Sequence, residues 1–213
     1  MKVFKFEVDE AYAKENNEML RDNNRFKLSG SIFSLVLLVF GGVMWWLADG
    51  AAWGWISGLV FAVLALIFLG VTFVAPQKMG SPQELYDRYP LAPAIIVEAN
   101  ARDAVIMALV NTNVDPQIPP RWGLALRTIN RTGVHQNKVG TQVPVAAVHG
   151  QRATKDPHHW LQILPMPITW GTKDKDVVNE ARKSIPHEQW VLLEKHRNRY
   201  EEVKGTRYNM LVL

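Results

Sequence analysis

The most constraining feature of this sequence is an almost uncharged stretch between Lys27 and Lys78, in which Asp49 is the one ionisable side chain. Two apolar runs fill it, at residues 31–48 and 51–75. An α-helix rises about 1.5 Å per residue, so the first run gives about 27 Å, and residues 28–30 extend it to the hydrocarbon thickness of about 30 Å. The buried helices of soluble proteins keep a polar stripe, and neither run has one. We therefore predict two transmembrane helices.

Asp49 and Gly50 alone separate the two runs, which predicts a tight antiparallel hairpin with Gly50 in the left-handed conformation. Four tryptophans flank this turn. Indole rings favour the headgroup level of a bilayer, where the ring is sheltered and the N–H group stays hydrated. We predict that these membrane-interface anchors are Trp45, Trp46, Trp53 and Trp55.

Lysine and arginine side chains lie near the outer ends of both runs and are absent from the turn. Arg21, Arg25 and Lys27 precede the first run, and Lys78 and Arg88 follow the second. Basic flanks resist translocation, so both termini are predicted on the cytoplasmic side of the plasma (inner) membrane. The first apolar run also begins too far along the chain for a cleaved signal peptide.

Glycines thin both predicted helices. Gly54 and Gly58 form a G-x-x-x-G pattern, and Gly41 and Gly42 are adjacent in the first helix. Such residues let two backbones approach closely, either within the hairpin, which we favour, or in a dimer. Neither run contains His, Lys, Arg or Glu, so ion transport or haem ligation by these helices alone is disfavoured.

The segment before the membrane has a pattern of its own. Residues 2–8 alternate in polarity and predict a short strand. Asp9 stands where a helix N-cap is expected, and a helix of about four turns should follow and lead to the first membrane helix. Its apolar residues are few, so we expect it to dock on the C-terminal domain. The predicted segments are an N-terminal arm (1–27), the hairpin (28–75), a linker (76–82) and a cytoplasmic domain (83–213).

Alternating apolar residues and turn signals predict a small antiparallel sheet or partly open barrel in the C-terminal domain, with helices at its end. The fold class is therefore a membrane α-hairpin joined to an α+β domain. Residues 100–103 and 130–133 suit turns, Pro186 suits the first turn of the last helix, and Gly205 should end that helix. The expected strands are residues 94–99, 104–111, 121–129, 141–149, 160–164 and 208–213, and the expected helices are residues 83–89, 174–184 and 186–203.

Few residues suggest chemistry. The chain has no cysteine, which excludes disulfides, thiolate nucleophiles and cysteine-based zinc or iron–sulfur sites. It has no phosphate-binding glycine loop and no G-x-S-x-G motif. His158 and His159 follow Asp156, but adjacent histidines on a strand point to opposite faces, so a polar loop is favoured over a metal site. No catalytic, cofactor-binding or metal-binding residue is predicted.

Two features are candidate contacts with a partner or with lipid. Trp170 lies among prolines and glycine in residues 164–172, where it is either a partner anchor or, as we favour, a buried side chain that plugs the sheet. A basic set on the C-terminal helices either forms a solvated helix face or contacts anionic lipid; its members are Arg182, Lys183, Lys195, Arg197 and Arg199. Glutamates dilute this set, so nucleic-acid binding is not expected.

Several stretches together resemble a known family. They are MKVFKFEVDEAYA at the start, the tryptophan-flanked hairpin, VPVAAVH at 143–149 and LPMPITWGT at 164–172. This layout resembles an actinobacterial, chiefly corynebacterial, family of two-span membrane proteins whose soluble part is a domain of unknown function. The resemblance implies an accessory subunit of the cytochrome bcc–oxidase respiratory supercomplex, and it implies no catalytic residue.

The predicted function is accordingly that of a non-catalytic accessory or scaffolding subunit. The hairpin is expected to pack on integral membrane protein partners, and the cytoplasmic domain to bind or stabilise them. The alternative is a membrane-tethered enzyme or small-ligand sensor, with its site between the sheet and residues 156–160.

Overall fold

A computed structural model describes residues 2–77, 80–130, 138–153 and 156–213. The chain divides into two compact units. One is a helical hairpin, Glu18–Ser81, and the other combines the residues up to Asn17 with Pro82–Leu213. The second unit therefore takes its residues from both sides of the hairpin.

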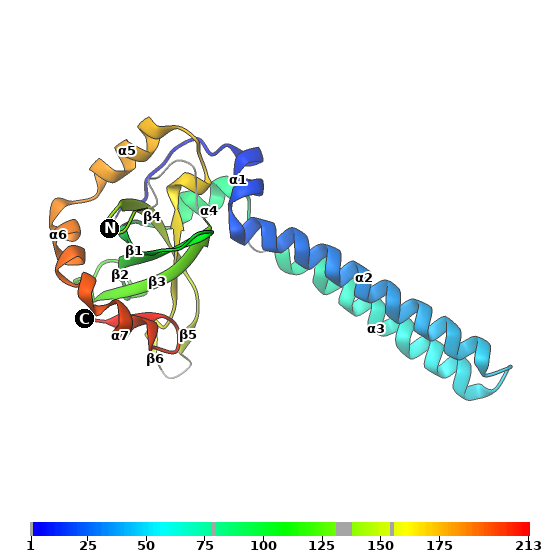
Figure 1. The fold of residues 1–213 in the computed structure, drawn as a ribbon. Helices are drawn as coiled ribbons and strands as arrows, with labels where there is room; N and C mark the ends of the chain where they lie inside the picture. Colours follow the sequence, from blue (N-terminus) through cyan, green and yellow to red (C-terminus); the bar gives the residue numbers. More distant parts are fainter. Residues whose placement is uncertain (1, 78–79, 131–137, 154–155) are drawn as a thin grey trace. The chain divides into compact units, whose positions relative to one another are not determined.

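The hairpin consists of helix α2 (Glu18–Leu47) and helix α3 (Ala52–Gln77), which run antiparallel side by side (Figure 1). Asp49 and Gly50 form the turn with positive φ angles of 46° and 83°, so the predicted tight turn and the left-handed Gly50 are confirmed. Both helices are long and apolar enough to cross a membrane by length and composition. Only 11% of the most apolar window of each helix is buried.

Glycines allow the two helices of the hairpin to lie close together, because they have no Cβ atom. A Cβ atom added to Gly41 would lie 2.9 Å from the Cβ of Phe61, and one added to Gly54 would lie 2.1 Å from the Cβ of Ala48. A Cβ atom added to Gly58 would lie 3.5 Å from the carbonyl oxygen of Gly41, so Gly58 faces the same contact. Gly42 differs from its neighbour, because nothing lies within 4 Å of its added Cβ. The close approach predicted for Gly42 does not occur within the hairpin.

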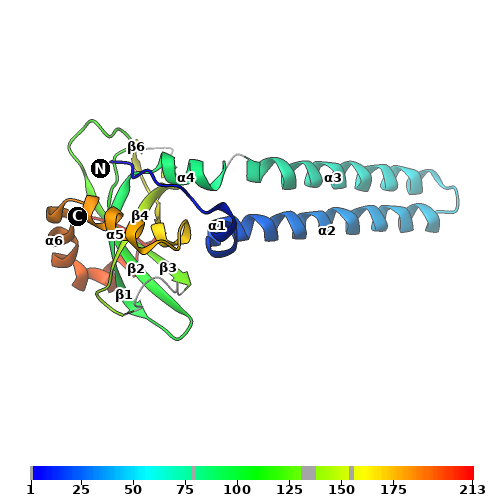
Figure 2. The same ribbon diagram turned by 90° about the horizontal axis from the view of Figure 1, so that it is seen from above.

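The second unit is built around an antiparallel sheet with helices beside it (Figure 2). The strand order of the sheet is β7-β4-β1-β2-β3-β8. The strands are β1 (Leu91–Ala99), β2 (Asp103–Asn111), β3 (Trp122–Asn130), β4 (Gln142–His149), β7 (Ile163–Pro167) and β8 (Met210–Val212). Strand β3 also contacts β7, where a guanidinium nitrogen of Arg127 donates to the carbonyl of Pro165 at 3.3 Å. The sheet is therefore curled into a half-barrel, which agrees with the predicted α+β fold.

Helices cover this sheet. Helix α5 (Lys175–Ser184) packs against β4, α6 (His187–Lys195) against β1 and β2, and α7 (Tyr200–Lys204) against β3. Two short helices, α1 (Glu10–Asn16) and α4 (Pro82–Arg88), pack on each other. Residues 106–110 of β2 are buried without a break, so both faces of the central sheet are covered.

The predicted strand at residues 2–8 is wrong. This arm is extended, but it cannot add to β1, because β2 and β4 already occupy both edges of that strand. Its backbone makes one contact with the strand, from the Leu91 N–H to the Lys2 carbonyl at 2.8 Å. The side chain of Gln83 accepts from the N–H of Val8 and donates to the carbonyl of Phe6, both at 2.9 Å. Residues 2–8 thus dock on the C-terminal domain. The helix for which docking was expected begins as α1, which packs on α4 of the same unit.

The predicted N-cap at Asp9 is confirmed, since its carboxylate accepts from the Tyr12 N–H at 3.0 Å. The predicted helix of four turns is wrong. Helix α1 ends at Asn16, and α2 begins at Glu18 and continues through the first apolar run. Asn17 adopts an extended conformation between them, and its buried amide donates to the sulfur of Met166 at 3.3 Å.

Two further expectations need correction. The helix predicted for residues 186–203 is broken after Lys195 by a 3₁₀ turn (η2, Arg197–Arg199), and Pro186 is its N-cap and not part of its first turn. The strand predicted for residues 160–164 straddles β6 (Asp156–Trp160) and β7, which a turn separates. The terminal strand does return to the sheet, where β8 pairs with β3. The predicted turn at residues 130–133 lies mostly outside the described residues.

Candidate functional site

Residues 156–160 were expected to form a polar loop, but they form strand β6, which pairs with the short strand β5 (Arg152–Ala153). The loop between β2 and β3 holds this ribbon in place. The Val114 N–H donates to the His158 carbonyl at 2.9 Å, and the Trp160 N–H donates to the Thr112 carbonyl at 2.7 Å. The β5–β6 ribbon is therefore held in place by the β2–β3 loop, which lies far from it in the sequence.

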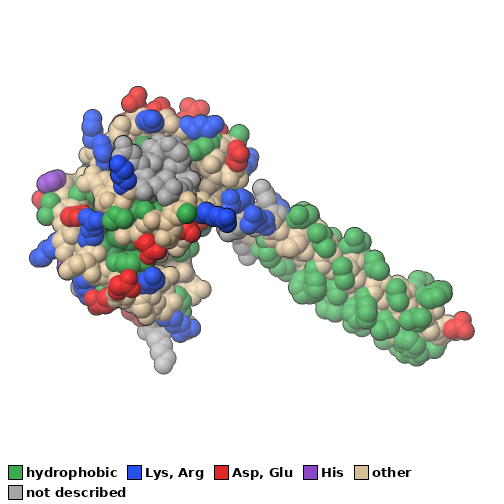
Figure 3. All heavy atoms as spheres, viewed as in Figure 1, with side chains coloured by type: hydrophobic (Ala, Val, Ile, Leu, Met, Phe, Trp, Pro, Cys, Tyr) green, Lys and Arg blue, Asp and Glu red, His purple; other side chains and the backbone are tan. Residues whose placement is uncertain are grey.

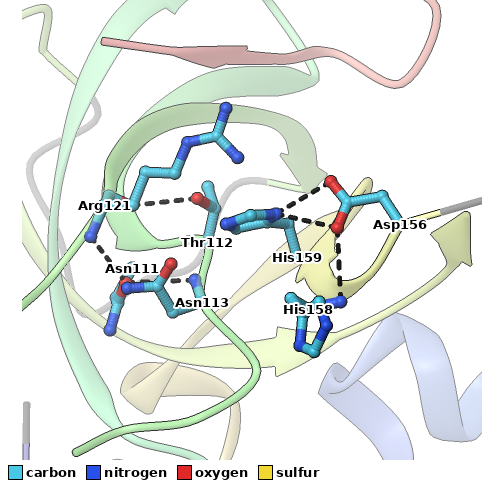
Figure 4. A network of polar contacts seen from close by, with 7 residues as sticks. All are labelled: Asn111, Thr112, Asn113, Arg121, Asp156, His158 and His159. Atoms are coloured by element: carbon cyan, nitrogen blue, oxygen red, sulfur yellow. Dashed lines mark hydrogen bonds and ion pairs between the residues drawn. The ribbon is translucent and has the colours of Figure 1, made fainter. Parts of the chain in front are cut away.

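The side chains of His159 and Asp156 form a hydrogen-bonded pair in this region (Figure 4). The Nδ1 atom of His159 lies 2.9 and 2.8 Å from the two carboxylate oxygens, so Nδ1 carries the proton and donates it. This hydrogen bond is the main reason that the pKa of Asp156 is lowered, and the charge of Arg121 contributes to the shift. The pairing fixes the tautomer of His159 and leaves Nε2 able to accept a proton.

The adjoining loop is closed by asparagine side chains. The Oδ1 atom of Asn111 accepts from the backbone N–H groups of Asn113 and Arg121, both at 3.1 Å. The amide of Asn113 donates to the Pro119 carbonyl at 2.8 Å. These bonds, drawn in part in Figure 4, hold Arg121 near Asp156 without a direct salt bridge.

This network offers two metal ligands at most. His158 points away from the pair formed by His159 and Asp156 (Figure 4). Within the described ranges, no group of three or more His, Asp or Glu side chains is placed to hold a metal ion. The chemistry available to the pair is proton transfer at Nε2 of His159, and the contacts around it mainly join β6 to the β2–β3 loop.

An aromatic stack that no sequence pattern predicted lies next to the network. The ring of His149 stacks on Trp160 at 4.4 Å with an interplanar angle of 18°, and Tyr89 meets His149 edge-on at 5.2 Å. The guanidinium of Arg152 lies over the Trp160 ring at 5.0 Å. Burial lowers the pKa of His149, so this imidazole is kept neutral at the centre of the stack.

A second polar cluster joins α7 to the β1–β2 hairpin. The hydroxyl of Tyr200 donates to the carboxylate of Glu98, which also accepts from the amide of Asn100 at 2.9 Å. The ammonium of Lys204 is 3.8 Å from the same carboxylate. The hydrogen bond from Tyr200 is the main cause of the lowered pKa of Glu98. Glu98 and Tyr200 lie 102 positions apart in the chain, and no local sequence pattern connects them.

The basic set predicted as a lipid or partner contact divides into two parts. Arg197 pairs with Glu194 at 2.9 Å, and Arg199 makes two bonds to Glu202 at 2.7 and 2.8 Å. Both arginines are thus partly neutralised by neighbours on the helix. The other three, Arg182, Lys183 and Lys195, have no ion pair among the described residues.

Arg182 and Lys183 border a hollow of about 430 Å³ at the junction of α5 and α6. His187 and Trp190 also line it, and of the described residues in its lining none is acidic. We call the segment Arg182–His187 the basic elbow. Its uncompensated positive charge is suited to an anion.

The remaining predicted contacts lie in different environments. Trp170 is fully buried, with the guanidinium of Arg127 over its ring at 4.8 Å, which favours the core role over the partner anchor. The four tryptophans around the hairpin turn (Trp45, Trp46, Trp53 and Trp55) are each more than half exposed. That exposure suits their predicted place at a membrane interface, which remains a prediction.

Comparison with models of known protein families gives a match for this chain. The model of the family described as "Protein of unknown function (DUF3239)" matches residues 77–201, which is more than half of the chain. The chain belongs to the DUF3239 family. The match runs from the end of α3 to the start of α7, so the DUF3239 region includes the sheet up to β7, the polar network and the basic elbow.

A solved structure of a similar protein is known. It is described as the crystal structure of a "putative membrane protein" from Corynebacterium diphtheriae, and it shares 49% sequence identity with this chain at a TM-score of 0.55. The similarity covers 58% of this chain and 99% of the other. This supports the resemblance to corynebacterial membrane proteins. No curated protein matches the chain significantly.

Proposed function

We propose that this DUF3239 protein is a two-span membrane protein whose hairpin is a bilayer anchor. The observation that carries this proposal is the surface of the hairpin, which is apolar along α2 and α3 (Figure 3). Soluble monomers rarely expose apolar patches of more than about 600 Å². In a bilayer the same surface contacts lipid tails, which are as apolar as its own side chains, so its exposure carries no free-energy penalty.

The polar groups of the hairpin support insertion as well. Hydrocarbon offers no hydrogen bonds, so each polar group in it needs an internal partner. All five hydroxyl side chains of residues 28–75 donate to a carbonyl of their own helix, at 2.7 to 3.2 Å; they are Ser29, Ser31, Ser34, Ser57 and Thr72. The charged exception, Asp49, lies in the turn, where it reaches the interface.

The orientation follows from the basic residues near the outer ends of the hairpin. Arg21, Arg25 and Lys27 precede the apolar part of α2, and the turn has no basic residue. Both termini and the DUF3239 domain are therefore placed in the cytoplasm by this proposal.

The anchored domain acts as a non-catalytic accessory subunit that binds membrane protein partners. Two observations support this role: the hairpin presents an uncharged outer surface, and the polar clusters of the domain join its own elements together. The cytochrome bcc–oxidase supercomplex stays a prediction from the family resemblance, because neither the fold nor the comparisons bear on it.

Purification in mild detergent tests the accessory role. The tagged full-length chain is extracted from its native membrane, and co-purifying proteins are quantified by mass spectrometry against an unrelated two-span protein with the same tag. We expect a membrane partner in stoichiometric amount. A monodisperse monomer without a partner would contradict the accessory role, and respiratory subunits among the partners would support the finer assignment.

A further inference from the structure

The N-terminal arm covers a second cavity beside the basic elbow. The cavity has a volume of about 540 Å³, and we call it the arm cavity. One wall is residues 2–5 of the arm, and the other is the elbow at Ser184, Ile185 and Pro186. Small-molecule sites usually have volumes of about 300–1,000 Å³, so the arm cavity is of a suitable size.

The arm is held at both ends of the part that lines this cavity. Lys2 accepts a backbone hydrogen bond from Leu91, and Phe6 accepts one from the side chain of Gln83. Between these two points, residues 3–5 make no backbone-to-backbone hydrogen bond with any described residue. The backbone of residues 3–5 therefore crosses the cavity without pairing to a strand.

The walls of the arm cavity are mostly apolar. Val3 and Phe4 of the arm, Leu91 of β1, and Ile185 and Pro186 of the elbow line it. Such walls favour the apolar part of a ligand, because its transfer from water is worth about 25 cal/mol for each Å² that is buried.

The charges at the cavity have one sign. Lys2 and Lys5 line it, both are exposed, and none of the described lining residues is acidic. Neither lysine has an ion pair within the described part of the chain. Arg182 and Lys183 border the neighbouring hollow, which shares Ser184, Ile185 and Pro186 with the arm cavity. The positive region is therefore continuous across the elbow, and it suits an anionic group.

One polar atom in the lining lacks a partner. The side-chain oxygen Oε1 of Gln189 is buried and accepts no hydrogen bond from the described residues. A buried acceptor that stays unpaired costs about 1–3 kcal/mol, so such atoms are normally paired with water or a ligand. A hydroxyl donor on a bound molecule would pair it once the Gln189 amide turns its oxygen toward the cavity.

We propose that the arm cavity binds an amphiphilic anion, in which a phosphate monoester or a carboxylate carries a short apolar chain and a hydroxyl donor. The anionic group lies near Lys2 and Lys5, the chain lies against Phe4 and Ile185, and the hydroxyl donates to Gln189. This inference does not depend on the accessory role of the hairpin. A soluble metabolite and an anionic lipid share this chemistry, and the experiment separates these two sources.

Calorimetric titration of the full-length protein tests the proposal. The protein is reconstituted in nanodiscs of zwitterionic lipid and titrated with hexyl phosphate, and the heat from empty nanodiscs is subtracted. At pH 6 hexyl phosphate supplies the anion, the chain and a P–OH donor. We expect saturable binding of hexyl phosphate, at least about tenfold tighter than that of hexanol or of inorganic phosphate, because each of these lacks one part of the ligand.

Variants locate the binding. Lys2→Gln together with Lys5→Gln is expected to weaken binding about fivefold, and Gln189→Leu should weaken it as well. The matched control replaces Lys138 and Lys195, two exposed lysines outside the cavity lining, with Gln and should bind within twofold of the wild type. Circular dichroism confirms that each variant is folded. A further variant, Ser184→Trp, fills the cavity and should abolish binding.

Three outcomes would overturn the proposal: no saturable binding, equal binding by the cavity and control variants, or equal affinity for hexyl phosphate and hexanol. A repeat in nanodiscs that contain anionic phosphatidylglycerol identifies the source. Weaker apparent binding of hexyl phosphate there shows that an anionic lipid competes for the cavity. Unchanged binding shows that the ligand is a soluble anion.

Discussion

The contact between the two hairpin helices predicts different effects for two adjacent glycines. Gly41→Ala adds a Cβ atom 2.9 Å from the Cβ of Phe61 and 3.4 Å from the carbonyl oxygen of Gly58. Gly42→Ala adds the same atom where nothing lies within 4 Å. The two substitutions are chemically identical and differ only in the face of α2 that they change.

The expected magnitude follows from that distance. Carbon atoms in contact prefer a separation of about 3.5–4.0 Å, so the helices must move apart locally by about 1 Å to accept alanine at position 41. Overpacking of this kind costs about 1–3 kcal/mol. Lipid supplies no compensating hydrophobic gain for such a shift. Gly42→Ala meets no atom and should change the stability by less than about 0.5 kcal/mol.

Steric trapping measures this difference directly. The natural chain has no cysteine, so biotin can be attached only at introduced cysteines, for example Ser29→Cys and Val74→Cys near the open end of the hairpin. Streptavidin binds both biotins only when the helices separate, and its binding curve gives the free energy of separation. Equal free energies for the two alanine variants would refute the assignment of Gly41 to the helix contact.

Four further predictions concern the DUF3239 domain. Tyr86→Phe should lower the free energy of unfolding in urea by about 1–3 kcal/mol, because the buried Tyr86 hydroxyl donates to the Pro167 carbonyl at 3.0 Å. Asp174→Ala removes the N-cap of α5 and should cost about 1 kcal/mol in the same assay, whereas Asp174→Asn keeps the acceptor and should cost less. Because burial lowers the pKa of His149, the unfolded state takes up its proton first, and stability should fall as the pH drops below about 6.5; His149→Phe should remove this dependence. Because the pKa of Glu98 is lowered, its contribution is present above about pH 4.3 and is lost at lower pH, which hydrogen exchange of α7 should show in the wild type and not in Glu98→Gln.

Local signals in the sequence predicted the elements that local interactions form. The β1–β2 hairpin is an example, since turn residues separate two apolar runs and the Asn100 N–H donates to the Asp103 carbonyl at 2.9 Å. The hairpin of α2 and α3 is another, because two residues between long helices permit only an antiparallel return. Both predictions needed no knowledge of distant partners.

Contacts between residues far apart in the sequence determine the features that were not predicted. Strand β4 pairs with β1 and β7, so the order of the sheet depends on contacts that no local pattern contains. The same holds for the arm, whose alternation predicted a strand although no edge of β1 was free to accept one. In the polar clusters, the pairing of Glu98 with Tyr200 and the stack of His149 on Trp160 join residues from separate elements. The sequence located His159 and Asp156, but the β2–β3 loop that positions them was not predicted.

Labelling of single cysteines in intact cells tests the central claim most directly. Ala51→Cys places a thiol at the exposed turn of the hairpin, and Lys183→Cys places one on the basic elbow of the DUF3239 domain. A maleimide that cannot cross the membrane should label position 51 in intact cells and position 183 only after permeabilisation. Labelling of position 183 in intact cells, or protection of position 51 there, would contradict a two-span protein with a cytoplasmic domain.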